Sequence, residues 1–316
     1  VLWALAALPG REGARPAESR GLIGAADAAL ASAIRGELGS ADAAGLRAQH
    51  IASAAWAVSR LPEEDPALAS CKSWRFLSTM GASMSSVRPL LSNDPRALAA
   101  TVMACVKVSM QDEVLLQHLA DEAHCQLESA AEHFDAQSLA NLAWALARMG
   151  DTSAACLGPQ TGAALRSLAE EVAARVEVGR GRWPEASPQH VSNIAWALAR
   201  ASANAAGEAC AGAFAALRQA SFHRLAEFEV QAISNTAWAF ARVAWDEAID
   251  DSGFPEALAA ASSRVRRWPQ AQRLANTAWA LSRLAVTAVE GESGMAFWCC
   301  CAAELVEGRA LARCSQ

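Results

Sequence analysis

A twelve-residue pattern that recurs along the chain restricts its possible folds more than any other feature of the sequence. It is clearest as QSLANLAWALAR at Gln137–Arg148, and related copies stand at Gln189–Arg200, Gln231–Arg242 and Gln272–Arg283. An earlier copy occupies Gln49–Arg60, and a degenerate copy occupies Arg96–Lys107. Because self-similarity at a regular spacing is the signature of repeat architectures, we predict that the chain is a repeat array.

The central residue of each copy defines the repeat length. These anchors are Trp3, Trp56, Met103, Trp144, Trp196, Trp238 and Trp279. Their successive separations are 53, 47, 41, 52, 42 and 41 residues, which indicates a period of about 40 with insertions in some connectors. We expect a single domain over residues 1–316, with clear repeats over 135–284 and the start of a further repeat over 285–316. Since Trp3 already belongs to a repeat, the chain is expected to be a fragment.

Each period is predicted to contain two helices. Apolar residues at helical spacing indicate first helices over residues 114–134, 163–176, 211–228 and 255–268, and the twelve-residue pattern is the second helix. Cap-type residues stand nine positions before three anchors, at Asp94, Asp135 and Ser187, and Pro95 and Pro188 follow two of them. The sequence therefore predicts an all-α fold, a right-handed α-solenoid of helix-turn-helix repeats.

The second helix has two unlike faces. Positions −5, −2, +2 and +5 from the anchor are mostly apolar, as in Leu139, Leu142, Leu146 and Met149. Positions −7, −3, 0 and +4 form what we call the polar stripe, as in Gln137, Asn141, Trp144 and Arg148. An offset of two residues corresponds to roughly 200°, so the stripes lie on opposite sides of the helix. Small residues at the flanks are expected to let neighbouring second helices pack closely.

Charge is divided between the two helical layers. The net charge is −6, yet the six twelve-residue windows contain no Asp or Glu and carry eight basic residues. The rest of the chain holds 19 of the 27 basic residues and all 33 acidic ones. Cations, amides and aromatic rings together suit single-stranded RNA. The candidate RNA-binding residues are therefore Arg60, Lys107, Asn141, Arg148, Asn193, Arg200, Asn235, Arg242, Asn276 and Arg283.

The same residues also have structural interpretations. An Arg at +4 lies in the last helical turn, where a cation complements the helix dipole whatever the function. The Asn at −3 could tie neighbouring backbones together. We expect the tryptophans to be structural anchors of the repeats, namely Trp56, Trp144, Trp196, Trp238 and Trp279. The alternative function is an armadillo-like scaffold for proteins or peptides, because such arrays also present Asn and Trp on one helix face.

Other chemistry receives no support from the sequence. The chain contains no phosphate-binding Gly loop, nucleophile elbow or zinc-protease helix. Its nine cysteines are scattered, and the spacing of His118, His124 and His133 is not that of a metal site. No apolar run is long enough to span a bilayer. We therefore expect no enzymatic activity, no cofactor, no metal and no membrane partner.

The stretches SLANLAWALARMG and SPQHVSNIAWALAR, which lie within residues 138–150 and 187–200, resemble the octotricopeptide repeat. The chain is similar also to the helical region of FAST-kinase-like proteins that end in a RAP domain. This resemblance implies a helical-pair repeat that binds single-stranded RNA, with about one nucleotide for each repeat. It further implies a place in the mitochondrion or chloroplast, and roles in RNA processing, stability, translation and other post-transcriptional regulation. Other proteins of an RNA-processing complex are possible partners.

Overall fold

The computed structural model describes residues 48–59, 87–88, 91–107, 112–152, 158–201, 207–243, 253–265, 267–284, 297–299 and 301. Every regular element within these ranges is a helix, which confirms the all-α fold. Trp3, Arg60 and most of the predicted repeat at 285–316 lie outside the described residues. Contacts between Cα atoms divide the chain into two compact units, Val1–Ala164 and Leu165–Gln316, and each is described by itself.

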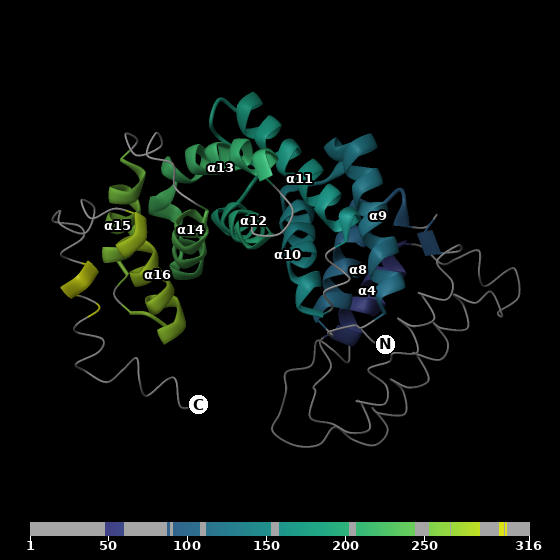
Figure 1. The fold of residues 1–316 in the computed structure, drawn as a ribbon, viewed down its shortest axis with the longest axis horizontal. Coiled ribbons are helices and arrows are strands. Elements are labelled where there is room, and N and C mark those ends of the chain that lie inside the picture. The colour runs from purple at the N-terminus through teal and green to yellow at the C-terminus, as the bar shows by residue number, and fades with distance from the viewer. Residues whose placement is uncertain are drawn as a thin grey trace, which may run out of the picture. The chain divides into compact units, whose positions relative to one another are not determined.

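The described part of unit 1 contains three second helices in a row. They are α4 (Ala48–Ser59), α8 (Pro95–Lys107) and α10 (Ala136–Thr152). Helix α8 lies between the other two and packs against both (Figure 1). A first helix, α9 (Glu113–Ala130), packs against α8 and ends in the short 3-10 turn η1 (Ala131–His133). The direct contact between successive second helices is the packing that their small flanking residues predict.

Unit 2 repeats this arrangement with the second helices α12 (Pro188–Ala201), α14 (Val230–Arg242) and α16 (Ala271–Leu284). Helix α14 packs against both α12 and α16 (Figure 1). The first helices are α11 (Pro159–Val178), most of which belongs to this unit, α13 (Gly207–Phe222) and α15 (Phe254–Ser263). The 3-10 turn η3 (Leu225–Glu227) follows α13, and α15 packs against α14 and α16.

Side-chain caps fix where three second helices begin. Asp94, Asp135 and Ser187 each accept a hydrogen bond from the backbone N–H three residues later, at 3.0, 2.8 and 3.3 Å. Pro95 and Pro188 occupy the first helical position, where a missing N–H costs nothing. These contacts confirm the predicted caps. Helix α14 differs, because its N-cap residue is Glu229 and no side chain caps it.

The apolar face of each second helix forms the core. Leu139, Leu142, Leu146 and Met149 are fully buried, which confirms the face that their spacing predicts. Burial of one such side chain stabilises the fold by about 1.5–3 kcal/mol. The flanking Ala143 and Ala145 are also fully buried, since they lie where neighbouring helices meet. Close contact between neighbouring helices therefore requires small residues at these positions.

Large apolar residues in the connectors complete the core. They stand 10 to 13 residues before successive anchors, and all of them are buried: Leu91, Phe134, Trp183, Phe228 and Trp268. In unit 2, Phe240 of α14 adds edge-to-face ring contacts with Phe214 and Phe254, at centroid distances of 5.5 and 4.9 Å. The connectors are thus part of the packed interior as well as links between helices.

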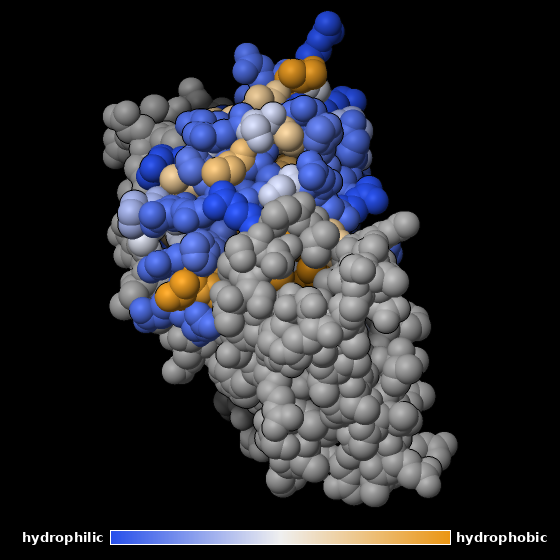
Figure 2. All heavy atoms as spheres, turned by 90° about the vertical axis from the view of Figure 1, so that its right-hand side faces the viewer, coloured by the Kyte–Doolittle hydropathy of each residue, from blue (hydrophilic) through white to orange (hydrophobic). Residues whose placement is uncertain are grey.

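The outward face of the described residues is mostly polar on one side of the molecule. Figure 2 presents the side that lies on the right of Figure 1, and its described residues are mainly hydrophilic. Apolar side chains appear there only in small separate groups. This distribution is typical of a helical layer whose apolar stripe is already covered by neighbouring helices.

Candidate nucleic-acid interface

Each clear second helix places an arginine over a tryptophan ring. The distance from the guanidinium carbon to the ring centroid is 5.0 Å for Arg148 over Trp144 and 5.5 Å for Arg200 over Trp196. The corresponding distances are 5.4 Å for Arg242 over Trp238 and 5.8 Å for Arg283 over Trp279. A spacing of four residues brings the two side chains to the same face of the helix, within the range of a cation–π interaction.

The anchor tryptophans are only partly covered. Trp56, Trp144, Trp196 and Trp238 are half-buried, and 44% of Trp279 is exposed. The fully buried tryptophans among the described residues are instead Trp183 and Trp268 in the connectors. The anchors therefore contribute to helix packing and also leave part of the indole at the surface.

The polar stripes of adjacent helices in unit 2 are in register. The rings of Trp196 on α12 and Trp238 on α14 have centroids 6.1 Å apart and are tilted by 33°. One turn earlier, Asn235 Nδ2 donates a hydrogen bond to Asn193 Oδ1 at 3.3 Å. Equivalent residues of successive copies thus contact each other directly, and the Asn row links neighbouring helices through its side chains.

The other two stripe asparagines are bonded within their own helices. Gln137 Nε2 donates to Asn141 Oδ1 at 3.4 Å, and Gln272 Nε2 donates to Asn276 Oδ1 at 2.8 Å. Each pair spans four residues, which is the spacing that places side chains next to each other on a helix. All four stripe asparagines are partly exposed. The structure therefore brings Gln, Asn, Trp and Arg together along one face, as the repeat pattern predicts.

One arginine of the stripe also contacts a neighbouring helix. Arg283 Nε donates to the backbone oxygen of Ala241, in the last turn of the preceding second helix, at 2.8 Å. A cation at this end of α14 complements its dipole. Arg148, Arg242 and Arg283 are exposed, and Arg200 is partly exposed. Lys107 is exposed at the +4 position of the degenerate copy, where Met103 replaces the tryptophan.

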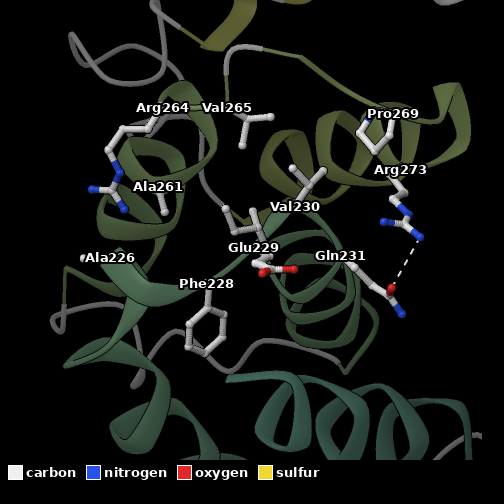
Figure 3. Close-up of a pocket in the computed structure, with 11 residues that line it drawn as sticks. Ala226, Phe228, Glu229, Val230, Gln231, Ala261, Arg264, Val265, Pro269 and Arg273 are labelled. Atoms are coloured by element: carbon white, nitrogen blue, oxygen red, sulfur yellow. Dashed lines mark hydrogen bonds between the residues drawn. The ribbon is translucent and has the colours of Figure 1, made fainter. Parts of the chain in front are cut away.

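A cavity of about 510 Å³ lies at the N-terminal end of α14. Figure 3 shows Arg264 and Arg273 at opposite sides of the cavity in this view, with Phe228, Glu229 and Gln231 between them. Arg273 Nη2 donates to Gln231 Oε1 at 3.3 Å, across neighbouring second helices, whereas Arg264 Nη2 donates to a backbone oxygen at 3.2 Å. Two guanidinium groups therefore line a hollow that begins at the first residue of the polar stripe. The sequence pattern did not predict this cavity, because its lining comes from connectors as well as helices.

The described residues offer little for other kinds of chemistry. Burial raises the pKa of Cys105 to about 12 and the pKa of Cys210 to about 11, so neither thiol ionises readily near neutral pH. His, Cys, Asp and Glu side chains in the described ranges nowhere gather in threes that could hold a metal ion. Within the same ranges, no helix has the length and apolar character needed to cross a membrane.

Comparison with known proteins adds no family to this description. No protein-family model matches the chain, and no curated protein matches it. The resemblance to the octotricopeptide repeat therefore rests on the repeat residues themselves. The polar stripe is the feature from which a function can be argued.

Proposed function

We propose that the chain binds single-stranded RNA along its second helices and has no enzymatic activity. The observation that carries this proposal is the recurrence of one arrangement in four copies, an arginine over a partly exposed tryptophan with a partly exposed asparagine beside it. Guanidinium groups bind phosphate, indole faces stack on bases, and amides bond to base edges. Because these three groups recur together, a linear polymer with the same three features is the best fit.

The charge of the layer supports the same partner. The twelve-residue windows carry no carboxylate, so a phosphate chain along the stripe would meet cations without a compensating repulsion from Asp or Glu. The residues outside these windows hold 19 basic and all 33 acidic residues, so the acidic excess of the chain lies there. Acid-free second helices on an acidic protein favour a ligand that lies along these helices over one that coats the whole surface.

We further infer that the repeats form an α-solenoid with a period of about 40 residues. The row of second helices within each unit supports this inference, since α8 packs between α4 and α10 and α14 packs between α12 and α16. Helix-pair repeats that contact only their neighbours build such arrays. The resemblance to the octotricopeptide repeat extends the proposal to organellar transcripts and to their processing, stability or translation, with other proteins of an RNA-processing complex as possible partners.

The test of this proposal is the binding of labelled single-stranded RNA by the full chain, measured by fluorescence anisotropy at low salt. Replacing the four stripe arginines by Glu (R148E, R200E, R242E and R283E) should weaken binding by about a hundredfold or more, because phosphate contacts supply most of the affinity. The matched control places Glu at four exposed arginines off the stripe, Arg166, Arg180, Arg182 and Arg267, and should bind nearly as the wild type does.

Retention of RNA binding in the four-site variant would reject the stripe as the binding surface. Circular dichroism must first establish that this variant keeps its helical content, because Arg283 also bonds to the preceding helix. If the wild-type chain bound no RNA at low salt but captured an extended peptide, the armadillo-like scaffold would replace the present proposal.

A further inference from the structure

The cavity at the N-terminal end of α14 combines an apolar floor with charged side chains of both signs. Phe228 and Ile233 line it and are buried, with exposed fractions of 7 and 2%. Glu229, Arg264 and Arg273 belong to the same lining, and Figure 3 shows Glu229 between the two arginines. The cavity volume of about 510 Å³ lies within the range of about 300–1,000 Å³ that is typical of ligand sites, which are likewise apolar with a few convergent polar groups.

The carboxylate in this cavity has no role in starting the helix. Position −9 from the anchor carries the helix cap in three other repeats, at Asp94, Asp135 and Ser187. The equivalent residue before α14 is Glu229, whose side chain makes no cap bond, and the described part of the chain gives it no ion pair either. Glu229 is exposed, so its carboxylate oxygens are available as acceptors for a ligand.

The two guanidinium groups of the cavity bond to other partners than this carboxylate. Arg264 Nη2 donates to the backbone oxygen of Leu225 at 3.2 Å, and Arg273 Nη2 donates to Gln231 Oε1 at 3.3 Å. Because an Arg side chain has five N–H donors, each guanidinium keeps donors beyond that one bond. The cavity thus brings unused donors and unused acceptors together beside an apolar floor.

This combination suits a nucleobase better than a phosphate group. A phosphate offers acceptors alone and would be repelled by the Glu229 carboxylate, whereas the edges of a nucleobase carry donors as well as acceptors. The cavity also begins at the polar stripe. Gln231, the first stripe residue of α14, belongs to its lining, and Arg273 is next to Gln272, the first stripe residue of α16. A strand that follows the stripes therefore passes the cavity, and one unstacked base can turn into it.

We propose that this cavity holds one guanine base of the bound RNA strand; this inference rests on the proposed RNA binding. Guanine is the RNA base whose pairing edge places two donor groups side by side, N1–H and the N2 amino group, and a carboxylate can accept from both. The guanine atoms O6 and N7 are acceptors, which suit Arg264 or Arg273. Adenine, cytosine and uracil each present one donor group on the pairing edge, so they satisfy the Glu229 carboxylate less fully.

A base held in this cavity determines how the strand is aligned. The four clear copies carry the same Asn, Trp and Arg at positions −3, 0 and +4. Similar contacts in each copy let a strand slide along the stripe at little cost. A guanine held at α14 fixes the register of the strand at that helix.

Strands of about twelve nucleotides test this proposal, measured by anisotropy with the full chain at low salt. Oligo(U) is compared with strands in which one central uridine is replaced by guanosine, adenosine, cytidine or inosine. We expect guanosine to tighten binding about tenfold, and adenosine or cytidine to change it by about twofold or less. Inosine keeps N1–H, O6 and N7 but lacks the N2 amino group, so it should lose most of the gain that guanosine gives.

The variant Glu229→Gln removes the carboxylate and keeps the size of the side chain. Gln has one acceptor oxygen, and its NH2 group would face the second donor of guanine, so the guanosine and inosine strands should bind this variant equally. Binding of oligo(U) should stay within about twofold of the wild type, because phosphate contacts along the stripe are retained. Glu185→Gln, at an exposed connector position outside the cavity lining, is the matched control and should keep the preference for guanosine.

Equal binding of oligo(U) and the guanosine strand by the wild-type chain would overturn the inference while leaving RNA binding intact. A guanosine preference that persists in Glu229→Gln would also overturn it, because another group would then read the base. Free guanosine monophosphate should bind about a hundredfold more weakly than the guanosine strand, since it lacks the stripe contacts, and equal affinity would overturn the strand as the source of the base. Failure of every strand to bind at low salt would overturn the proposed function itself.

Discussion

At the scale of single residues, the described repeat and connector tryptophans divide into two classes that composition cannot distinguish. Trp183 in a connector is 2% exposed, whereas Trp196 on α12 is half-buried and lies beneath Arg200. An arginine that covers an indole contributes about 0.5–1 kcal/mol at an exposed site. The buried ring mainly stabilises the fold, and the covered ring also remains available to a ligand.

This division predicts opposite effects of two equivalent substitutions. Trp183→Ala should lower the free energy of unfolding by about 3–5 kcal/mol, because it leaves a cavity in the core. Trp196→Ala should cost clearly less stability but weaken RNA binding by about 1–3 kcal/mol, the value of one stacked base. Urea unfolding and RNA anisotropy measure the two quantities. Equal destabilisation by both substitutions would identify Trp196 as a core anchor without a surface role.

At the scale of helices, the second helices could be predicted from the sequence with small errors at their ends. Their starts depend on local signals, since Asp94, Asp135 and Ser187 bond to the N–H groups three residues later. The packing of the connectors is not local. A large apolar residue recurs 10 to 13 positions before each anchor from Met103 onwards, and this signal could have identified Trp183 and Trp268 as buried.

The polar stripe was predictable as a set of residues but not as a set of contacts. The period of the helix places Asn141, Trp144 and Arg148 on one face without any tertiary information. The position of each guanidinium over an indole depends on rotamers, and the bond from Asn235 to Asn193 depends on the register of two helices. Neither follows from spacing alone, so these contacts emerged only from the structure.

The cap of α10 gives a prediction for pH. Burial raises the pKa of Asp135, but hydrogen bonds from Ser138 and Arg96 outweigh it, so the pKa lies below its ordinary value. The carboxylate therefore stabilises the fold above the ordinary Asp pKa of about 3.9, and this contribution is lost as pH falls through the lowered value. Asp135→Asn keeps a capping oxygen but does not titrate.

We expect the Asp135→Asn variant to be less stable than the wild type near neutral pH, with a difference that shrinks as the pH falls below the ordinary Asp pKa of about 3.9. Urea midpoints measured across the acidic range test this expectation. Glu177→Gln, at an exposed position of α11, controls for the removal of one acidic charge. A stability difference that stays constant with pH would mean that the carboxylate makes no net contribution at the cap.

At the scale of the whole molecule, an acidic chain and an RNA ligand are compatible only if the binding surface is a local one. The chain as a whole repels a polyanion because its net charge is −6. In the second-helix windows, however, all the Asp, Glu, Lys and Arg positions are basic. Long-range repulsion is weakened at physiological salt, where charges interact over about 8 Å. Contacts along the stripe are then stronger than the repulsion from distant carboxylates.

The salt dependence of binding should therefore report the number of stripe cations that contact phosphate. Binding to a single strand weakens with salt with a logarithmic slope of about −0.7 for each neutralised phosphate. If each of the four arginines that lie over tryptophans neutralises one phosphate, the expected slope is about −3. Each substitution of one of them by Gln should reduce its magnitude by about 0.7, whereas Gln at Arg180 should not. A slope near zero would mean that the arginines serve only the tryptophans and helix ends, because contacts within the protein release no counterions from RNA.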